Sequence, residues 1–229
     1  MFKRTLIAIF CFMATAVAFS QNKDNYALEE TVKNNHSVET NSFWRNCFIS
    51  IGAGTQMYVG DHDGLIGFGD RLSAALDISA GKWFDNGIGV RLSYSGLSAK
   101  GATRWNEAHS TGENVPGWGT GLNYSKFNLF NLHADAMFNL HTLIKGADEN
   151  RVWNTAPYVG IGCVHAMDAP KNSSFGFNAG WMNSFRINSR LDVNIDIRGL
   201  VMDDMIDGEE GGVKFDGLLT LTAGLTYKF

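Results

Sequence analysis

Residues 191–198 read LDVNIDIR, and this stretch decides the fold class. Leu191, Val193, Ile195 and Ile197 are apolar, whereas the residues that alternate with them are polar or charged. A period of two is typical of a β-strand, because its successive side chains point to opposite faces. This strand is therefore expected to separate an apolar environment from a polar one.

Seven further stretches alternate in the same way, which predicts eight strands between residues 43 and 229. Their apolar faces take every second residue of Ile49–Ala53, Leu72–Ala80, Ile88–Tyr94, Phe130–Phe138, Val159–Cys163, Phe177–Trp181 with Phe185, and Phe215–Phe229. The connections at 85–87 and 188–190 are short, and 141–153 is of medium length. The connections at 60–70, 99–121, 168–174 and 203–214 are rich in Gly and in acidic or amide residues.

The direction of the apolar face separates two kinds of barrel. In a soluble sandwich or lipocalin it points inward, and in an outer-membrane barrel it points to the lipid. The strand centres carry no charged residue on this face, where Arg or Lys at the bilayer midplane costs ~2–4 kcal/mol. Aromatic residues gather at the strand ends, as in the girdles at bilayer interfaces: Phe43, Trp44, Trp83, Phe84, Trp153, Tyr227 and Phe229.

The sequence therefore predicts an all-β protein with an eight-stranded antiparallel up-and-down transmembrane β-barrel over residues 43–229. A secreted barrel with a solvated polar exterior is the alternative. Residues 1–20 have the basic start, apolar run and small-residue cleavage pattern of a signal peptide, and the polar stretch 21–42 is expected to be a flexible periplasmic leader. An even strand count places both termini on one side of the membrane, and the short turns at 85–87 and 188–190 lie on that same side. Because short turns face the periplasm in outer-membrane barrels, we expect an outer-membrane location with both termini periplasmic.

The polar face is expected to line the lumen, which in an eight-stranded barrel is just wide enough for side chains to fill. Charges of both signs confined there should pair and plug the barrel. The expected network comprises Asp77, Arg91, His133, Asp135, Arg186, Asp192, Asp196 and Arg198. Arg186 and Asp192 flank the 188–190 turn symmetrically, which predicts a direct pair between them. His133 and Asp135 are interpreted as lumen packing, with a lipid-modifying catalytic site as the alternative.

Two features of the long connections admit more than one interpretation. Their acidic residues are expected to be solvated, with divalent-cation binding left open: Asp61, Asp63, Asp203, Asp204, Asp207, Glu209 and Glu210. Nothing matches an EF-hand. Trp105 and Trp118 either contact a partner or fold the longest connection onto itself. Cys47 and Cys163 are expected to remain unbridged, although an exported chain can form a disulfide.

The segments YVGDHDG, FGDRLSAALDISAGKWFDNGIGVRLSYSGLSAKGA, FNLHADAMFNL, LDVNIDIRGL and LTAGLTYKF resemble the barrel domain of OmpA-type outer-membrane proteins of Bacteroidetes. The resemblance covers about residues 44–229. Tyr227 and Phe229 resemble the terminal signal that the barrel-assembly machinery reads. Proteins of this type usually continue into a peptidoglycan-binding domain, and this sequence ends at Phe229, so we expect a stand-alone barrel.

These observations predict a non-enzymatic envelope protein or an accessory subunit of an outer-membrane assembly. A narrow channel for small solutes is the first alternative, and a lipid-modifying barrel enzyme is the second. No phosphate loop, metal-spaced Cys/His set or nucleophile elbow is present, so no catalytic, cofactor or metal residue is predicted. The expected partners are outer-membrane lipid and lipopolysaccharide, the barrel-assembly machinery during insertion, and other outer-membrane proteins. The net charge of −4 argues against nucleic acid.

Overall fold

The computed structural model describes residues 45–84, 87–106, 108–148, 150–209 and 214–229. The proposed signal peptide (1–20) and leader (21–42) lie outside the described residues. The strands are β1 (Cys47–Val59), β2 (Leu72–Trp83), β3 (Ile88–Thr103), β4 (Ser110–Asn114), β5 (Asn123–Phe138), β6 (Trp153–Ala166), β7 (Ser173–Arg186), β8 (Leu191–Asp203) and β9 (Phe215–Lys228). The helical segments are η1 (Asp63–Leu65), α3 (Phe68–Arg71), η2 (Gly119–Gly121), α4 (Leu140–Lys145) and η3 (Asp204–Asp207).

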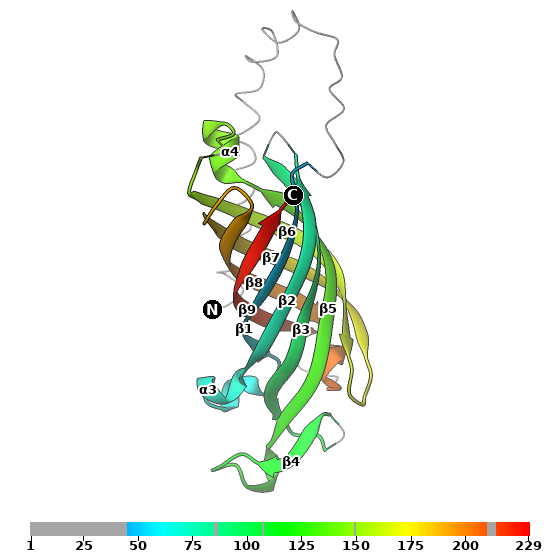
Figure 1. Cartoon of the computed structure of the whole chain (residues 1–229). Helices are drawn as coiled ribbons and strands as arrows, with labels where there is room; N and C mark the ends of the chain where they lie inside the picture. The colour runs from blue at the N-terminus through cyan, green and yellow to red at the C-terminus, as the bar shows by residue number, and fades with distance from the viewer. Residues whose placement is uncertain (1–44, 85–86, 107, 149, 210–213) are drawn as a thin grey trace, which may run out of the picture.

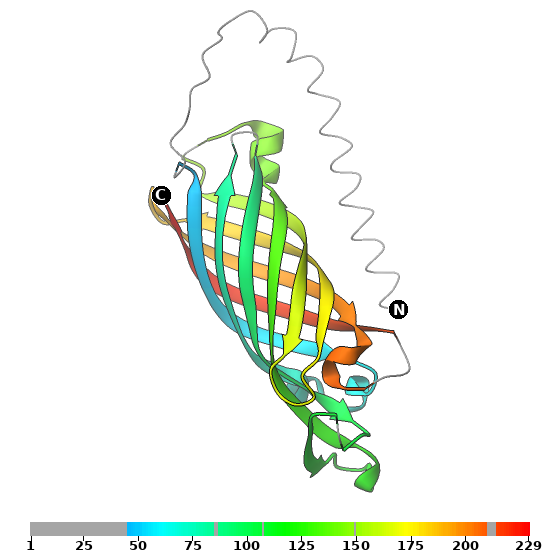
Figure 2. The same ribbon diagram turned by 90° about the vertical axis from the view of Figure 1, so that its right-hand side faces the viewer.

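Eight of the described strands form a closed barrel (Figures 1 and 2). They follow the order β3-β2-β1-β9-β8-β7-β6-β5, and pairing of β3 with β5 closes the circle. Every pairing is antiparallel, with β1 against β9 joining the first strand to the last. β4 lies within the longest connection and pairs only with the start of β5, at Asn123 and Ser125. The predicted fold class is confirmed.

The apolar face of each strand points outward. Leu92 is 57% exposed, whereas its neighbour Arg91 is 4% exposed. The same contrast holds along β8, where Ile195 and Ile197 are exposed and Asp196 and Arg198 are buried. An apolar exterior around a polar interior is the arrangement of an outer-membrane barrel. None of the described helices is long and apolar enough to span a membrane.

The connections sort by length to the two ends of the barrel. The short ones share an end with the C-terminus and the start of β1, and the long ones lie at the other end (Figure 2). In the turn between β7 and β8, Asn188 Oδ1 accepts hydrogen bonds from the backbone N–H groups of Arg190 and Leu191. Gly87 adopts φ +78° after β2, while Asp85 and Asn86 lie outside the described residues. The medium connection contains α4, which the sequence did not predict.

The aromatic residues at the strand ends are divided between lipid and lumen. Phe84, Trp153, Tyr227 and Phe229 are exposed, whereas Phe43 and Trp44 lie outside the described residues. The assignment of Trp83 to the girdle is wrong. Odd-numbered residues of β2 face the lumen, and the Trp83 ring accordingly packs against Phe48 at 6.2 Å between centroids.

The barrel wall is interrupted between β2 and β3 at the end with long loops. Their pairing ends at Ala75 and Leu97, and β3 then continues to Thr103 against β5 alone. Gln56 Nε2 donates to the Ser98 carbonyl at 2.8 Å, and Asp63 Oδ1 accepts from the Ala102 N–H at 2.8 Å. Side chains therefore satisfy part of the backbone that the ladder leaves open. A side chain at Gly101 would displace the Asp63 carboxylate, because a Cβ would lie 2.0 Å from Asp63 Oδ1.

Candidate functional site

The lumen is stacked in layers that can be read along β5. From the long-loop end, its inward side chains are apolar at Phe127 and Leu129, polar from Asn131 to Asp135, and apolar again at Met137. All of these side chains are buried. The interior therefore consists of a polar core between two apolar layers.

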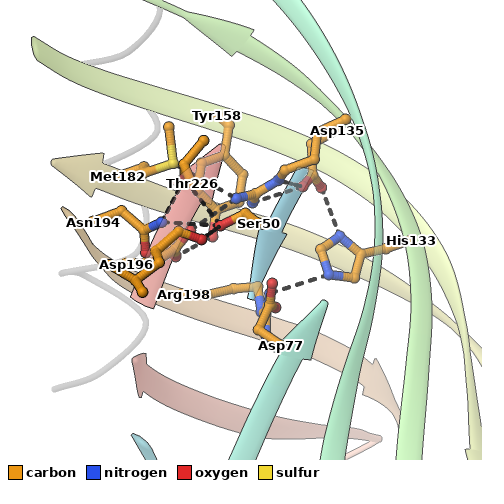
Figure 3. A network of polar contacts seen from close by, with 12 residues as sticks. Ser50, Asp77, His133, Asp135, Tyr158, Met182, Asn194, Asp196, Arg198 and Thr226 are labelled. Carbon is orange, nitrogen blue, oxygen red and sulfur yellow. Dashed lines mark hydrogen bonds and ion pairs between the residues drawn. The ribbon is translucent and has the colours of Figure 1, made fainter. Parts of the chain in front are cut away.

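Arg91 contacts three residues of the polar core that Figure 3 labels, namely Asp135, Asp196 and Tyr158. Its Nε donates to Asp135 Oδ2 at 2.9 Å, and its Nη1 donates to Asp196 Oδ2 at 2.9 Å. The guanidinium also stacks on Tyr158, 4.2 Å from the ring centroid, and the Tyr158 hydroxyl donates to Asp196 at 2.5 Å. Three groups from three other strands are thus fixed around one cation, because a guanidinium offers donors in several directions.

His133 joins this centre to a second ion pair. Its Nδ1 lies 2.8 Å from Asp135 Oδ1 and its Nε2 lies 3.1 Å from Arg198 Nη1. An arginine only donates, so Nε2 must accept and the proton lies on Nδ1, facing Asp135. Arg198 Nη1 also donates to Asp77 Oδ2 at 2.7 Å. The chain of contacts therefore runs from Asp77 to Tyr158 and crosses the lumen.

The structure brings together six of the eight ionisable residues predicted for the lumen: Asp77, Arg91, His133, Asp135, Asp196 and Arg198. They come from β2, β3, β5 and β8, and Tyr158 adds β6. Strands that are not neighbours in the sheet are thereby cross-linked through the interior. Buried charges are tolerated in this way only when each one is paired and hydrogen-bonded.

The alternation in the sequence does not predict the two apolar layers of the lumen. The one towards the long loops comprises Tyr58, Ala99, Phe127, Leu129, Val164, Ala166, Leu200, Met202, Ile206 and Leu218. The other comprises Phe48, Met137, Ala156, Tyr158 and Met182, with Trp83 packed against it. A signal was present, since these apolar residues occupy the lumen register beyond the strand centres. They close the lumen on both sides of the charges.

Asp192 lies at the short-turn mouth of the lumen, but its predicted ion pair with Arg186 is not formed. The two residues are opposite each other in register, as expected. The Asp192 carboxylate instead contacts Lys228 Nζ at 2.6 Å and Ser184 Oγ at 3.0 Å. Arg186 Nε donates to the carbonyl of Asn188, beyond the strand end. The turn competes for the guanidinium, while Lys228 enters the lumen from β9 on the other side. A cavity of about 140 Å³ opens at this mouth.

The prediction that the acidic residues of the long loops are solvated is wrong for Asp63, Asp204 and Glu209, which are buried. Glu209 accepts a hydrogen bond from the Thr103 hydroxyl, and its Oε2 lies 2.9 Å from His62 Nδ1. The second contact ties the connection before β9 to the connection between β1 and β2. Burial raises the pKa of Asp63, and burial together with nearby carboxylates raises the pKa of Asp207 to about 7. Asp61 and Asp203 are exposed, and Glu210 lies outside the described residues.

Trp105 and Trp118 are both exposed, so they do not fold the longest connection onto itself. That role falls to Val115 and Leu122, which pack with Ile66 and Ala102. Cys47 and Cys163 are unbridged. Among the described residues, no group of three or more His, Cys, Asp or Glu side chains is arranged to hold a metal ion.

This architecture and its sequence are similar to those of known outer-membrane proteins. The chain is 29% identical over 217 residues to Outer membrane protein 40 of Porphyromonas gingivalis, covering 88% of this chain and 52% of that protein. It superimposes on the crystal structure of Neisserial surface protein A with a TM-score of 0.53 and 13% identity, over 80% of this chain and 97% of that one. The chain is an eight-stranded outer-membrane β-barrel. No family model matches it.

The match to a Porphyromonas protein confirms the resemblance of this barrel to outer-membrane proteins of Bacteroidetes. The barrel spans about half the length of that relative. Its likeness to Neisserial surface protein A, at 13% identity, is one of fold. OprG of Pseudomonas aeruginosa matches more weakly, with a TM-score of 0.46 and 12% identity over 81% of this chain and 96% of that one.

Proposed function

We propose that this barrel is a non-enzymatic structural component of the outer membrane, serving envelope integrity directly or as an accessory subunit of a larger assembly. The observation that carries the proposal is the cross-linked lumen around Arg91. Apolar layers on both sides of that centre close the interior. A closed barrel offers the membrane a rigid body with an outer surface and loops, but no route for solutes.

A narrow channel is the first alternative. Its lumen would need a continuous polar path, whereas Phe127, Leu129 and Tyr58 fill one side of the charged core and Met137 and Phe48 fill the other. The cavity at the short-turn mouth is bounded by Trp83 and Met182 and by the Asp192–Lys228 pair. These contacts favour the structural role.

A lipid-modifying enzyme is the second alternative, and it would use His133 with Asp135. His133 is 1% exposed, and both of its ring nitrogens are engaged, one by Asp135 and the other by Arg198. A general base needs one free nitrogen within reach of the substrate proton. This His–Asp pair therefore supports packing rather than catalysis.

The proposed orientation puts both termini and the short turns in the periplasm and the long loops outside, as is usual for such barrels. The proposed partners are outer-membrane lipid and lipopolysaccharide around the wall, and other outer-membrane proteins at the loops. During insertion the partner would be the barrel-assembly machinery, which would read Tyr227 and Phe229.

Complementation of a deletion strain tests the structural role against the enzymatic one. The strain is expected to become sensitive to detergent and bile salts, and the wild-type gene is expected to restore resistance. His133→Gln, which keeps the size and a donor beside Asp135, should restore resistance equally if the barrel folds. Full insertion of His133→Gln without restored resistance would favour the enzyme. Resistance of the deletion strain equal to wild type would reject the envelope role.

A further inference from the structure

Two lysines face each other on the outer wall of the barrel. Lys100 of β3 and Lys126 of β5 are direct cross-strand partners. Like charges in this position destabilise a sheet unless something neutralises them. Among the residues that the structure describes, neither ammonium lies within ion-pair distance of a carboxylate.

Both lysines line one groove, which lies where β2 and β3 separate. The groove has a volume of about 380 Å³, and its other lining residues are Gly54, Thr55, Leu72, Ser73, Ala74 and Ser98. Leu72 and Ala74 belong to the outward apolar face of β2, so the groove continues into the lipid-facing wall. It therefore combines two cations at one side with an apolar surface at the other.

The groove lies at the level of a bilayer surface. Along β3 the exposed apolar side chains run from Val90 to Leu97, a length close to the ~9–11 residues with which a tilted strand crosses the hydrocarbon. Lys100 follows three residues later, at the long-loop end. Charged headgroups of membrane lipids are found at this depth, while acyl chains lie along the residues below.

We propose that this groove binds a lipid that carries a phosphomonoester, with the phosphate between Lys100 and Lys126 and an acyl chain against Leu72 and Ala74. Such a phosphate carries about −1.5 to −2 charges at neutral pH, which matches two ammonium groups better than the single charge of a phosphodiester. The hydroxyl of Ser98 lines the same groove and adds a donor. In the orientation proposed above, the lipid belongs to the external leaflet.

The other polar groups of the groove are already engaged, which concentrates recognition on the lysines. Thr55 Oγ1 donates to the Ser73 carbonyl at 3.0 Å, and Ser73 Oγ donates to the Gln56 carbonyl at 3.1 Å. Gln56 Nε2 holds the Ser98 carbonyl at 2.8 Å. These bonds tie β1 to β2 and to β3 around the gap, and the gap gives an acyl chain access to the groove wall.

Native mass spectrometry of the detergent-purified barrel tests the site. The probes are lipid A bearing its phosphomonoester, the same lipid after dephosphorylation, and inorganic phosphate. We expect lipid A to be retained, and dephosphorylation to weaken binding by about tenfold or more, as the loss of a charged hydrogen bond does. Lys100→Gln and Lys126→Gln should each weaken it to a similar extent. Lys171→Gln is the matched control, since it removes a lysine from the same end but outside the groove.

Lys126→Glu separates lipid binding from folding. It places a carboxylate opposite Lys100, so the sheet should be retained while lipid A binding is lost. Equal binding by wild type and the Gln variants would overturn the site, and so would equal binding of dephosphorylated lipid A. If inorganic phosphate alone binds as tightly and displaces lipid A, the site is one for free anions and the lipid assignment is wrong. Detergent samples have no leaflets, so none of these outcomes depends on the proposed orientation or structural role.

Discussion

Arg91 is the residue on which the polar core depends most. Its side chain is 3% exposed and pairs with two carboxylates while stacking on Tyr158. Removing one partner from a buried ionic group leaves uncompensated charge, which costs about 3–5 kcal/mol when burial is complete. We therefore expect Arg91→Met to lower the unfolding free energy in micelles by that order, measured as the urea midpoint of the gel-mobility shift between folded and unfolded barrel.

The control for Arg91→Met removes the stranded charges as well. Adding Asp135→Asn and Asp196→Asn should recover much of the lost stability, because no unpaired carboxylate remains. A single Arg91→Met variant as stable as wild type would show that the charges are not coupled through Arg91.

The Asp192–Lys228 ion pair at the short-turn mouth is expected to contribute less to stability than Arg91 does. The Lys228 side chain is 32% exposed, so this ion pair is partly screened by water. Pairs of this kind contribute up to about 1 kcal/mol. Asp192→Ala should lower the urea midpoint modestly, and Arg186→Ala should lower it less, since Arg186 bonds the Asn188 carbonyl instead. An Arg186→Ala loss as large as that of Asp192→Ala would contradict this assignment.

Among the elements, the loop that contains η3 predicts a pH dependence. Burial and neighbouring carboxylates raise the pKa of Asp207 to about 7, from a usual value near 4. Between these values the folded loop binds the proton and the unfolded chain does not, so the contribution of Asp207 to stability falls as pH rises from about 4 to 7 and is level above. The protection factors of residues 204–209 against hydrogen exchange, corrected for the intrinsic pH dependence of exchange, should therefore fall over this range. Asp207→Asn should flatten the profile, and an unchanged slope in that variant would assign the titration to another group.

Strand alternation explains how much of the molecule could be predicted from its sequence. Along β8 a strict period of two fixes both the strand and the direction of Asp196 and Arg198. The signal fades where both faces are apolar, and for that reason Leu200 and Met202 were not recognised as lumen packing. Contacts between distant elements leave no periodic trace: Lys228 reaches Asp192, and Asp63 reaches the edge of β3.

At the scale of the whole molecule, assembly depends on the last strand. β9 pairs with both β1 and β8, and Tyr227 and Phe229 point outward with ring centroids 5.3 Å apart. If these rings form the signal for the assembly machinery, deletion of Phe229 should reduce the amount of barrel in isolated outer membranes. Phe215→Ala is the control, because it removes an exposed aromatic side chain from the other end of the same strand. Normal insertion of the truncated chain would reject the signal.

Side chains close the barrel interior from one apolar layer through the charged core to the other. Conductance of the purified barrel in a planar lipid bilayer tests this most directly. The filled lumen predicts at most small, flickering currents and no passage of sugar-sized solutes. A steady conductance of porin size would contradict the filled lumen and establish the channel in its place.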